Sequence, residues 1–184
     1  LLEGLKGTVA AVRVPWGMFT LLGLQGMEVL SKVLMKAREL GYYVLLDGLD
    51  FSTPAAAEMV AESVFDREEW PCDGVVVPML CEYFSLEGLT QLMITIREVK
   101  KRFNPALDLS GILITMYNGR LNLSAEVLHE LKKFYSDKLF KTMVPRSVRL
   151  SEAPSYGEPI QYYDGRSKCA EAYNEVAREL AIRI

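Results

Sequence analysis

The chain has 184 residues and a formal net charge of −3 at pH 7, and 50% of its residues are hydrophobic and 24% charged. This length suits one domain with a proper hydrophobic core, the composition is ordinary for a globular protein, and the net charge argues against a general nucleic-acid binder. No apolar run reaches the roughly 18 residues that a membrane span needs, and the opening residues lack the layout of a signal peptide.

Short β-rich runs alternate with longer helical runs along the chain. Strands are expected at five apolar runs, at 8–14, 42–46, 73–79, 109–116 and 139–144, the second buried on both faces. Helices are expected at 26–40, 54–65, 85–103, 124–135 and 168–182, and mostly loop, with two prolines, at 147–161. Strands that alternate with helices imply a parallel sheet covered on both faces. About five strands are too few for a closed eight-fold barrel, so we predict a single α/β domain over 1–184, with an open, mostly parallel, doubly wound sheet.

The cysteines and the single histidine argue against a metal site. Cys72, Cys81 and Cys169 form no CxxC pair, and His129 stands alone, whereas zinc needs about four clustered ligands. An odd number of cysteines without a secretory signal indicates reduced thiols. We therefore expect a cytoplasmic protein with no bound metal and no membrane partner.

Basic residues crowd one stretch in the second half of this mildly acidic chain, with only Asp137 opposing them. They are Lys132, Lys133, Lys138, Lys141, Arg146 and Arg149. A local basic face is expected there even though the whole chain is acidic.

Four segments in the second half share their order and spacing with one family. They are CEYFSLEGL at 81–89, GILITMYNGRLNL at 111–123, VPRSVRLSEAPSYGEPI at 144–160 and YDGRSKCAEAY at 163–173. Together they resemble the C-terminal half of ParA/Soj-type chromosome and plasmid partitioning ATPases, over residues 73–184. The resemblance implies a nucleotide-binding fold of the P-loop NTPase type, present here without its phosphate loop.

In that family the protein binds ATP, dimerises around it, and holds DNA non-specifically through basic residues. The resemblance assigns Arg120 and Arg149 to the DNA-binding surface, and arginine offers a planar fork of donors suited to phosphate oxygens. On residue chemistry alone, Arg120 is a turn residue after Asn118-Gly119, and Arg149 is part of a packed loop. The resemblance also implies that two segments border the adenine base: Thr115, Met116 and Tyr117, and Pro145 and Arg146.

The loop that would hold the phosphates of ATP is absent from this sequence. Phosphate binding needs a glycine-rich loop with a lysine and a hydroxyl, placed after a strand. The nearest string, GLKGT at 4–8, precedes the first expected strand and is interpreted as a turn. The family's aspartate motif, similar to IIDCPPS, is also missing. We therefore predict a non-catalytic module with no cofactor, unless ATP and Mg²⁺ still bind at a cryptic site, and with DNA, a ParA-type partner or a second copy as its partners.

Residues 1–79 faintly resemble bacterial orotidine 5′-monophosphate decarboxylase. The resemblance is carried by AAVRVP at 10–15, GLQGMEVL at 23–30, GYYVLLDG at 41–48 and STPAAA at 52–57. Its chemistry needs an alternating Lys/Asp array that stabilises a carbanion. Only Asp47 matches that array, because Arg13 and Leu49 stand where the family has lysines and Asp50 lies one residue too late.

The sequence thus predicts a chimera-like chain, with a decarboxylase-like segment over 1–72 joined to a ParA-like segment over 73–184. A working decarboxylase is not expected. Two alternatives to the ParA-like module stay open: a degenerate decarboxylase-like protein, and a folded domain with no retained activity.

Overall fold

The structure is a computed structural model that describes residues 2–9, 11–47, 74–102 and 104–183. The chain divides into two compact units. The first comprises Leu1–Cys72 and Val99–Pro105, and the second comprises Asp73–Glu98 and Ala106–Ile184. The helix expected at 54–65 lies outside the described residues, as do Leu49 and Asp50.

The first unit contains a short parallel βαβ arrangement. Its elements are η1 (Glu3–Leu5), β1 (Ala11–Pro15), α1 (Trp16–Thr20), α2 (Gly23–Glu39) and β2 (Tyr43–Asp47). β1 pairs with β2 in parallel, from Ala11 opposite Tyr43 to Pro15 opposite Asp47. Gly41 follows the cap of α2 with a φ of 79°, a conformation that favours glycine, and so stops the helix where the sequence predicts.

The second unit holds the larger part of the described chain. Its elements are β3 (Gly74–Met79), α4 (Tyr83–Arg102), β4 (Asp108–Ile114), α5 (Asn122–Tyr135), α6 (Val148–Glu152), η2 (Ala153–Tyr156), α7 (Ile160–Tyr163) and α8 (Lys168–Arg183). β3 pairs with β4 in parallel. Two isolated parallel bridges join Ile112 to Leu139 and Tyr117 to Pro145, so the chain after α5 runs alongside β4.

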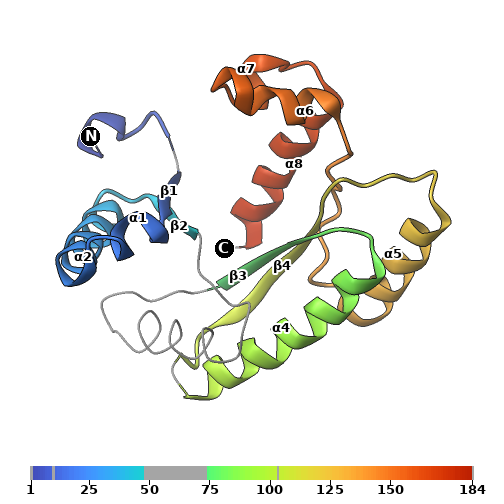
Figure 1. Ribbon diagram of the computed structural model, residues 1–184, viewed down its shortest axis with the longest axis horizontal. Coiled ribbons are helices and arrows are strands. Elements are labelled where there is room, and N and C mark those ends of the chain that lie inside the picture. Colours follow the sequence, from blue (N-terminus) through green and yellow to red (C-terminus); the bar gives the residue numbers. More distant parts are fainter. Residues whose placement is uncertain (1, 10, 48–73, 103, 184) are drawn as a thin grey trace. The chain divides into compact units, whose positions relative to one another are not determined.

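Side chains of β4 alternate between two cores, one on each face of the sheet. Ile112 and Ile114 belong to a cluster with residues of α4 and α5, whereas Leu113 packs with Phe140, Val144 and residues of α8. Figure 1 shows the same arrangement, with α4 and α5 on one side of β3 and β4 and α8 on the other. Parallel strands buried on both faces read as continuous apolar runs, which is how the sequence presents this strand.

The α/β architecture with parallel strands is confirmed, and the helices expected at 26–40, 85–103, 124–135 and 168–182 form within three residues of those limits. The sheet is smaller than expected, because the described residues form two sheets of two strands each. The stretch 139–144 makes bridges but no full strand. Its Lys141 and Thr142 N–H groups donate to the Glu179 carboxylate, at 2.8 and 2.9 Å, instead of to β4.

The expectation of loop over most of 147–161 was wrong. This stretch contains α6, η2 and the start of α7. Its two prolines begin helices, since Pro154 lies in the first turn of η2 and Pro159 is the N-cap of α7. A proline fits a first helical turn because the N–H it lacks would have no partner inside the helix there.

Candidate functional site

The two segments expected beside the nucleotide base lie next to each other. The Tyr117 N–H donates to the Val144 carbonyl at 2.9 Å, and the Arg146 N–H donates to the Tyr117 carbonyl at 3.2 Å. Tyr117 and Pro145 form the parallel bridge beyond the end of β4. The five residues therefore meet at the carboxyl edge of the β3–β4 sheet, which is where ligands collect in open α/β folds.

Thr115 and Met116 have different surroundings at this edge. The N–H and the hydroxyl of Thr115 both donate to the Met79 carbonyl, at 2.9 and 3.3 Å, so Thr115 is tied to the end of β3. Met116 has a φ of 50°, the left-handed region that a bulky residue rarely adopts, and 60% of it is exposed. Backbone strain of this kind gathers at functional sites, and here it turns an apolar side chain to the solvent.

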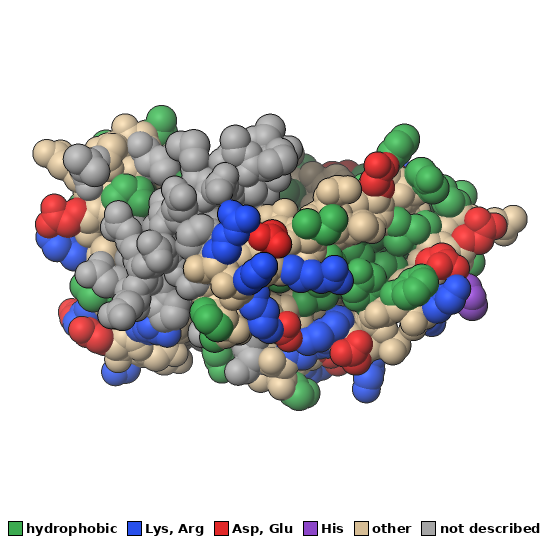
Figure 2. All heavy atoms as spheres, turned by 90° about the horizontal axis from the view of Figure 1, so that it is seen from below, with side chains coloured by type: hydrophobic (Ala, Val, Ile, Leu, Met, Phe, Trp, Pro, Cys, Tyr) green, Lys and Arg blue, Asp and Glu red, His purple; other side chains and the backbone are tan. Residues whose placement is uncertain are grey.

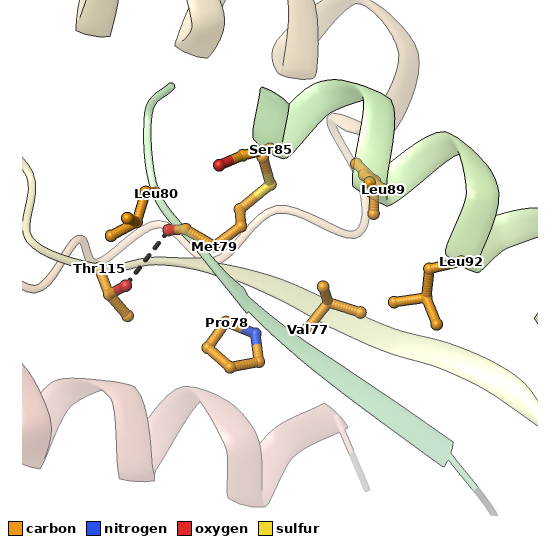
Figure 3. Close-up of a pocket in the computed structure, with 9 residues that line it drawn as sticks. Val77, Pro78, Met79, Leu80, Ser85, Leu89, Leu92 and Thr115 are labelled. Carbon is orange, nitrogen blue, oxygen red and sulfur yellow. Dashed lines mark hydrogen bonds between the residues drawn. The ribbon is translucent and has the colours of Figure 1, made fainter. Parts of the chain in front are cut away.

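A pocket of about 290 Å³ lies between the carboxyl end of β3 and the first turns of α4. It is lined by Val77, Pro78, Met79, Leu80, Ser85, Gly88, Leu89, Leu92 and Thr115. Figure 3 shows the hydrophobic side chains around it and the hydrogen bond from Thr115 to Met79. Its walls are mainly apolar, and the hydroxyls of Ser85 and Thr115 are the polar side-chain groups on its lining. Only Thr115 belongs to the set that the sequence analysis singled out.

The pocket was not found from the sequence, although a signal for it exists. Gly88 interrupts an otherwise well-formed helix, and a Cβ built there meets nothing within 4 Å. A glycine inside a helix with open space beside it often has a packing or functional reason. Combined with Pro78 at the end of the strand, it marks the opening between β3 and α4.

Arg120 lies in an exposed turn after β4. Its N–H donates to the Asn118 side-chain oxygen at 3.2 Å, and the Leu121 N–H donates to the Asn118 carbonyl, also at 3.2 Å. Asn118-Gly119 therefore forms a turn, as the residue chemistry suggests. Within the described part of the chain the Arg120 guanidinium forms no ion pair, which leaves it accessible to an anion.

Arg149 lies on α6 and is held by two carboxylates. Its Nη1 is 3.3 Å from an oxygen of Glu152, and its Nε is 3.9 Å from an oxygen of Asp164. A hydrogen bond with Tyr163 and then the charge of Glu152 raise the pKa of Arg149, so the side chain stays a cation. Because its side chain is 61% exposed, Arg149 is neither a packed loop residue nor a free cation.

The other residues of the predicted basic stretch divide between exposed and paired positions. Lys132, Lys133, Lys141 and Arg146 are exposed, and Lys138 pairs with Asp108 at 2.8 Å. Figure 2 shows that, on the face seen from below, Lys and Arg side chains gather over α4 with Asp and Glu side chains among them. Charges of both signs therefore mingle on that face.

Two residues of the decarboxylase-like segment contact each other in the first unit. Arg13 on β1 donates from its Nε to the Asp47 carboxylate at the end of β2, at 2.7 Å. Both side chains are substantially exposed. The pair is a surface ion pair across two parallel strands, and the decarboxylase resemblance stays a prediction.

The geometry of the second unit agrees with a match to a family model. The model is that of the CobQ/CobB/MinD/ParA nucleotide binding domain, and it matches residues 23–160. The chain belongs to this family. The match begins at residue 23, so it reaches well before the segments that carry the ParA resemblance in the sequence.

Curated relatives sharpen the relation within the family. The chain is 52% identical over 109 residues to the sporulation initiation inhibitor protein Soj of Bacillus subtilis, a match that covers 59% of this chain and 43% of the relative. It is 37% identical over 154 residues to the chromosome-partitioning ATPase Soj of Treponema pallidum, covering 84% of this chain and 57% of the relative. The chain therefore spans about half the length of these relatives, and the ParA/Soj-type resemblance is confirmed.

Solved structures support the fold. Cobyrinic acid a,c-diamide synthase from Mycobacterium smegmatis superposes with a TM-score of 0.56 at 23% identity, covering 96% of this chain and 68% of that chain. The MinD cell division protein of Aquifex aeolicus superposes with a TM-score of 0.58 at 16% identity, covering 84% of this chain and 60% of that chain. In the described part of this chain, no helix has both the length and the apolar character that crossing a membrane requires.

The residues present fit only part of a nucleotide. The paired segments at Tyr117 and Arg146 offer a place beside β4 for a base. No string of the form Gly-x-x-x-x-Gly-Lys-Ser/Thr occurs in the sequence, and the GLKGT string lies before β1, with Gly7 in a turn. Because the phosphates of ATP have no such cradle in this sequence, its residues support no reaction step through ATP.

Proposed function

We propose that this chain is a ParA/Soj-type partitioning-protein module that binds DNA non-specifically and does not hydrolyse ATP. One observation carries the proposal. Arg120 and Arg149 each lie three residues from the pair Tyr117 and Arg146, whose backbones are joined by a 3.2 Å hydrogen bond. An extended residue spans at most about 3.6 Å, so the two arginine Cα atoms lie within roughly 25 Å of each other. One DNA duplex can therefore meet both guanidinium groups.

The expected binding is weak and sensitive to salt. Each phosphate contact releases counterions, and two contacts give a slope of about −2 for log K against log salt concentration. The chain carries a net charge of −3, so long-range attraction adds little to these contacts. DNA binding by one copy alone is therefore expected at low salt and lost as salt rises.

A protein partner is also supported at the same edge of the sheet. Tyr83 and Phe84, at the start of α4, are exposed hydrophobic residues, and so is the strained Met116. Apolar side chains left in water favour association. A second copy of the chain, or a ParA-type partner, is the partner that the family relation implies. Light scattering across a range of concentrations tests self-association directly.

The test of DNA binding is fluorescence anisotropy of a labelled duplex at low salt, with and without ATP and Mg²⁺. Arg120→Ala combined with Arg149→Ala is expected to abolish binding. Arg38→Ala combined with Arg178→Ala removes the same charge from α2 and α8 and is expected to leave most of the binding. Unchanged binding in the first double variant overturns the proposal, and binding that rises with ATP overturns its non-catalytic part.

A further inference from the structure

Arg149 is surrounded by groups that fix its position. Glu152 lies one helical turn away on α6, and Asp164 is the C-cap residue of α7. We call Glu152 and Asp164 the acidic clamp. The Tyr163 hydroxyl donates to the Glu152 carboxylate at 3.1 Å. The clamp therefore draws its two carboxylates from separate short helices that meet at Arg149.

Tyrosine rings hold the clamp in place. The rings of Tyr163 and Tyr156 stack with centroids 5.0 Å apart and planes 28° apart. Tyr163 also packs against Ile160, Cys169 and Ala170, which are buried. Since Tyr163 is anchored in this small core, the Glu152 carboxylate that its hydroxyl contacts has a fixed place beside the guanidinium.

We infer that the acidic clamp is an autoinhibitory contact that competes with DNA phosphates for Arg149. This inference rests on the proposed function. A guanidinium presents five N–H donors, and carboxylates and phosphates use the same planar fork. A phosphate that binds Arg149 must displace Glu152 or Asp164, or accept their repulsion. Arg120 has no such carboxylate beside it among the described residues, so the clamp acts on one of the two arginines.

The size of the effect follows from the exposure of the pair. Arg149 and Glu152 are 61% and 42% exposed, and water screens exposed ion pairs strongly. Removing one carboxylate is therefore expected to tighten DNA binding roughly two- to fivefold. The clamp weakens the contact without closing it, which keeps the affinity of a single copy low.

A structural role makes the opposite forecast. If Glu152 only holds α6 and α7 together, its replacement loosens the segment that carries Arg149 and weakens DNA binding. Glu152→Gln separates the two roles, because the glutamine oxygen can still accept the Tyr163 hydroxyl while the negative charge is gone. The matched control is Glu175→Gln. Glu175 pairs with Arg178 on α8, also three residues apart and exposed, and the change in net charge is the same.

The experiment measures the affinity for a labelled DNA duplex at low salt for the wild type, Glu152→Gln, Asp164→Asn and Glu175→Gln. Each substitution is also made in an Arg149→Ala background. We expect Glu152→Gln and Asp164→Asn to bind roughly two- to fivefold more tightly than Glu175→Gln. We expect this gain to vanish without Arg149. Circular dichroism checks that each variant keeps its helices.

Each contrary result has a distinct meaning. If the wild type binds DNA and Arg149→Ala weakens it, but Glu152→Gln matches Glu175→Gln, the inference is wrong and the proposed function stands. A gain that persists in the Arg149→Ala background also overturns the inference, because net charge alone then explains it. If no variant binds DNA, the proposed function falls and the inference falls with it.

Discussion

The two units contain strands of similar sequence character but different surroundings. β2 in the first unit and β4 in the second are both apolar runs, and both pair in parallel with one named strand. In β4, five of seven residues are buried, whereas Tyr43 and Leu45 of β2 are 51% and 58% exposed. The expectation that 42–46 is buried on both faces was therefore wrong. An apolar run predicts a strand, but burial depends on the helices that cover it.

The largest test of this comparison removes one side chain from each unit. Phe140 is almost fully buried, and its ring carries the Arg183 guanidinium 4.5 Å from its centroid. Phe140→Ala is expected to lower the free energy of unfolding by about 3–5 kcal/mol, because the cavity it leaves cannot fully collapse. Leu45→Ala, at an exposed position, is expected to cost less than about 1 kcal/mol. Urea unfolding followed by circular dichroism measures both, and equal costs would contradict the comparison.

A second test adds atoms to the second unit instead of removing them. A Cβ built on Gly111 lies 2.4 Å from the Phe140 ring, so Gly111→Ala forces two buried groups apart. Overpacking of this kind is expected to cost about 1–3 kcal/mol.

Gly88 is the matched control for Gly111. A Cβ there meets nothing within 4 Å, and the residue lies inside α4. Gly88→Ala is expected to stabilise the chain by roughly 0.5–1 kcal/mol through helix propensity. Thermal unfolding of the two variants should shift the midpoint in opposite directions. A shift of the same sign in both would show that the close approach of Gly111 to Phe140 is not what requires glycine.

Local patterns in the sequence predicted local structure well. Helical spacing of apolar residues located α2, α4, α5 and α8, and glycine chemistry located the end of α2. The ParA-like motifs singled out Tyr117 and Arg146, which the backbone joins directly. These features depend on residues close together in the chain, or on a pattern shared by a family.

The sequence did not predict features that depend on distant partners. Nothing in the stretch 139–144 indicates that Glu179, 37 residues beyond Thr142, takes the N–H groups a strand would use. Nothing around Arg149 indicates that Asp164 and Tyr163 from another helix surround it. Such contacts follow from how α7 and α8 pack on the sheet, and charge alone does not specify which carboxylate meets which donor.

A third test uses the interruption that Glu179 makes beside β4. Partial burial by itself raises the pKa of Glu179, but hydrogen bonds from the Thr142 hydroxyl and from the N–H groups of Lys141 and Thr142 outweigh it and lower the pKa. A carboxylate with a lowered pKa stabilises the folded state above its unfolded pKa, near 4.5, and this contribution is lost as the pH falls through the folded value. The second unit should therefore lose stability below about pH 4.5.

Glu179→Gln measures that contribution. The amide places an NH₂ group among N–H and O–H donors, so we expect a cost of roughly 1–2 kcal/mol at neutral pH. The difference from the wild type should shrink as the pH is lowered below about 4.5. Glu175→Gln, an exposed position on the same helix, should show neither the cost nor the pH dependence. A cost that is constant from neutral to acidic pH would contradict the role of the carboxylate charge.

The smallest expected effect lies in the first unit, in the pair that joins its two strands. Arg13 and Asp47 contact each other across β1 and β2, with 69% and 41% of their side chains exposed. In a double-mutant cycle, Arg13→Ala and Asp47→Ala are expected to show a coupling of roughly 0.2–1 kcal/mol, the range for exposed ion pairs, that weakens as salt is added. A coupling above about 2 kcal/mol that resists salt would indicate a desolvated pair instead. The first unit would then have a charged contact as consequential as the Glu179 contacts of the second, and the contrast between an open unit and a covered one would no longer hold.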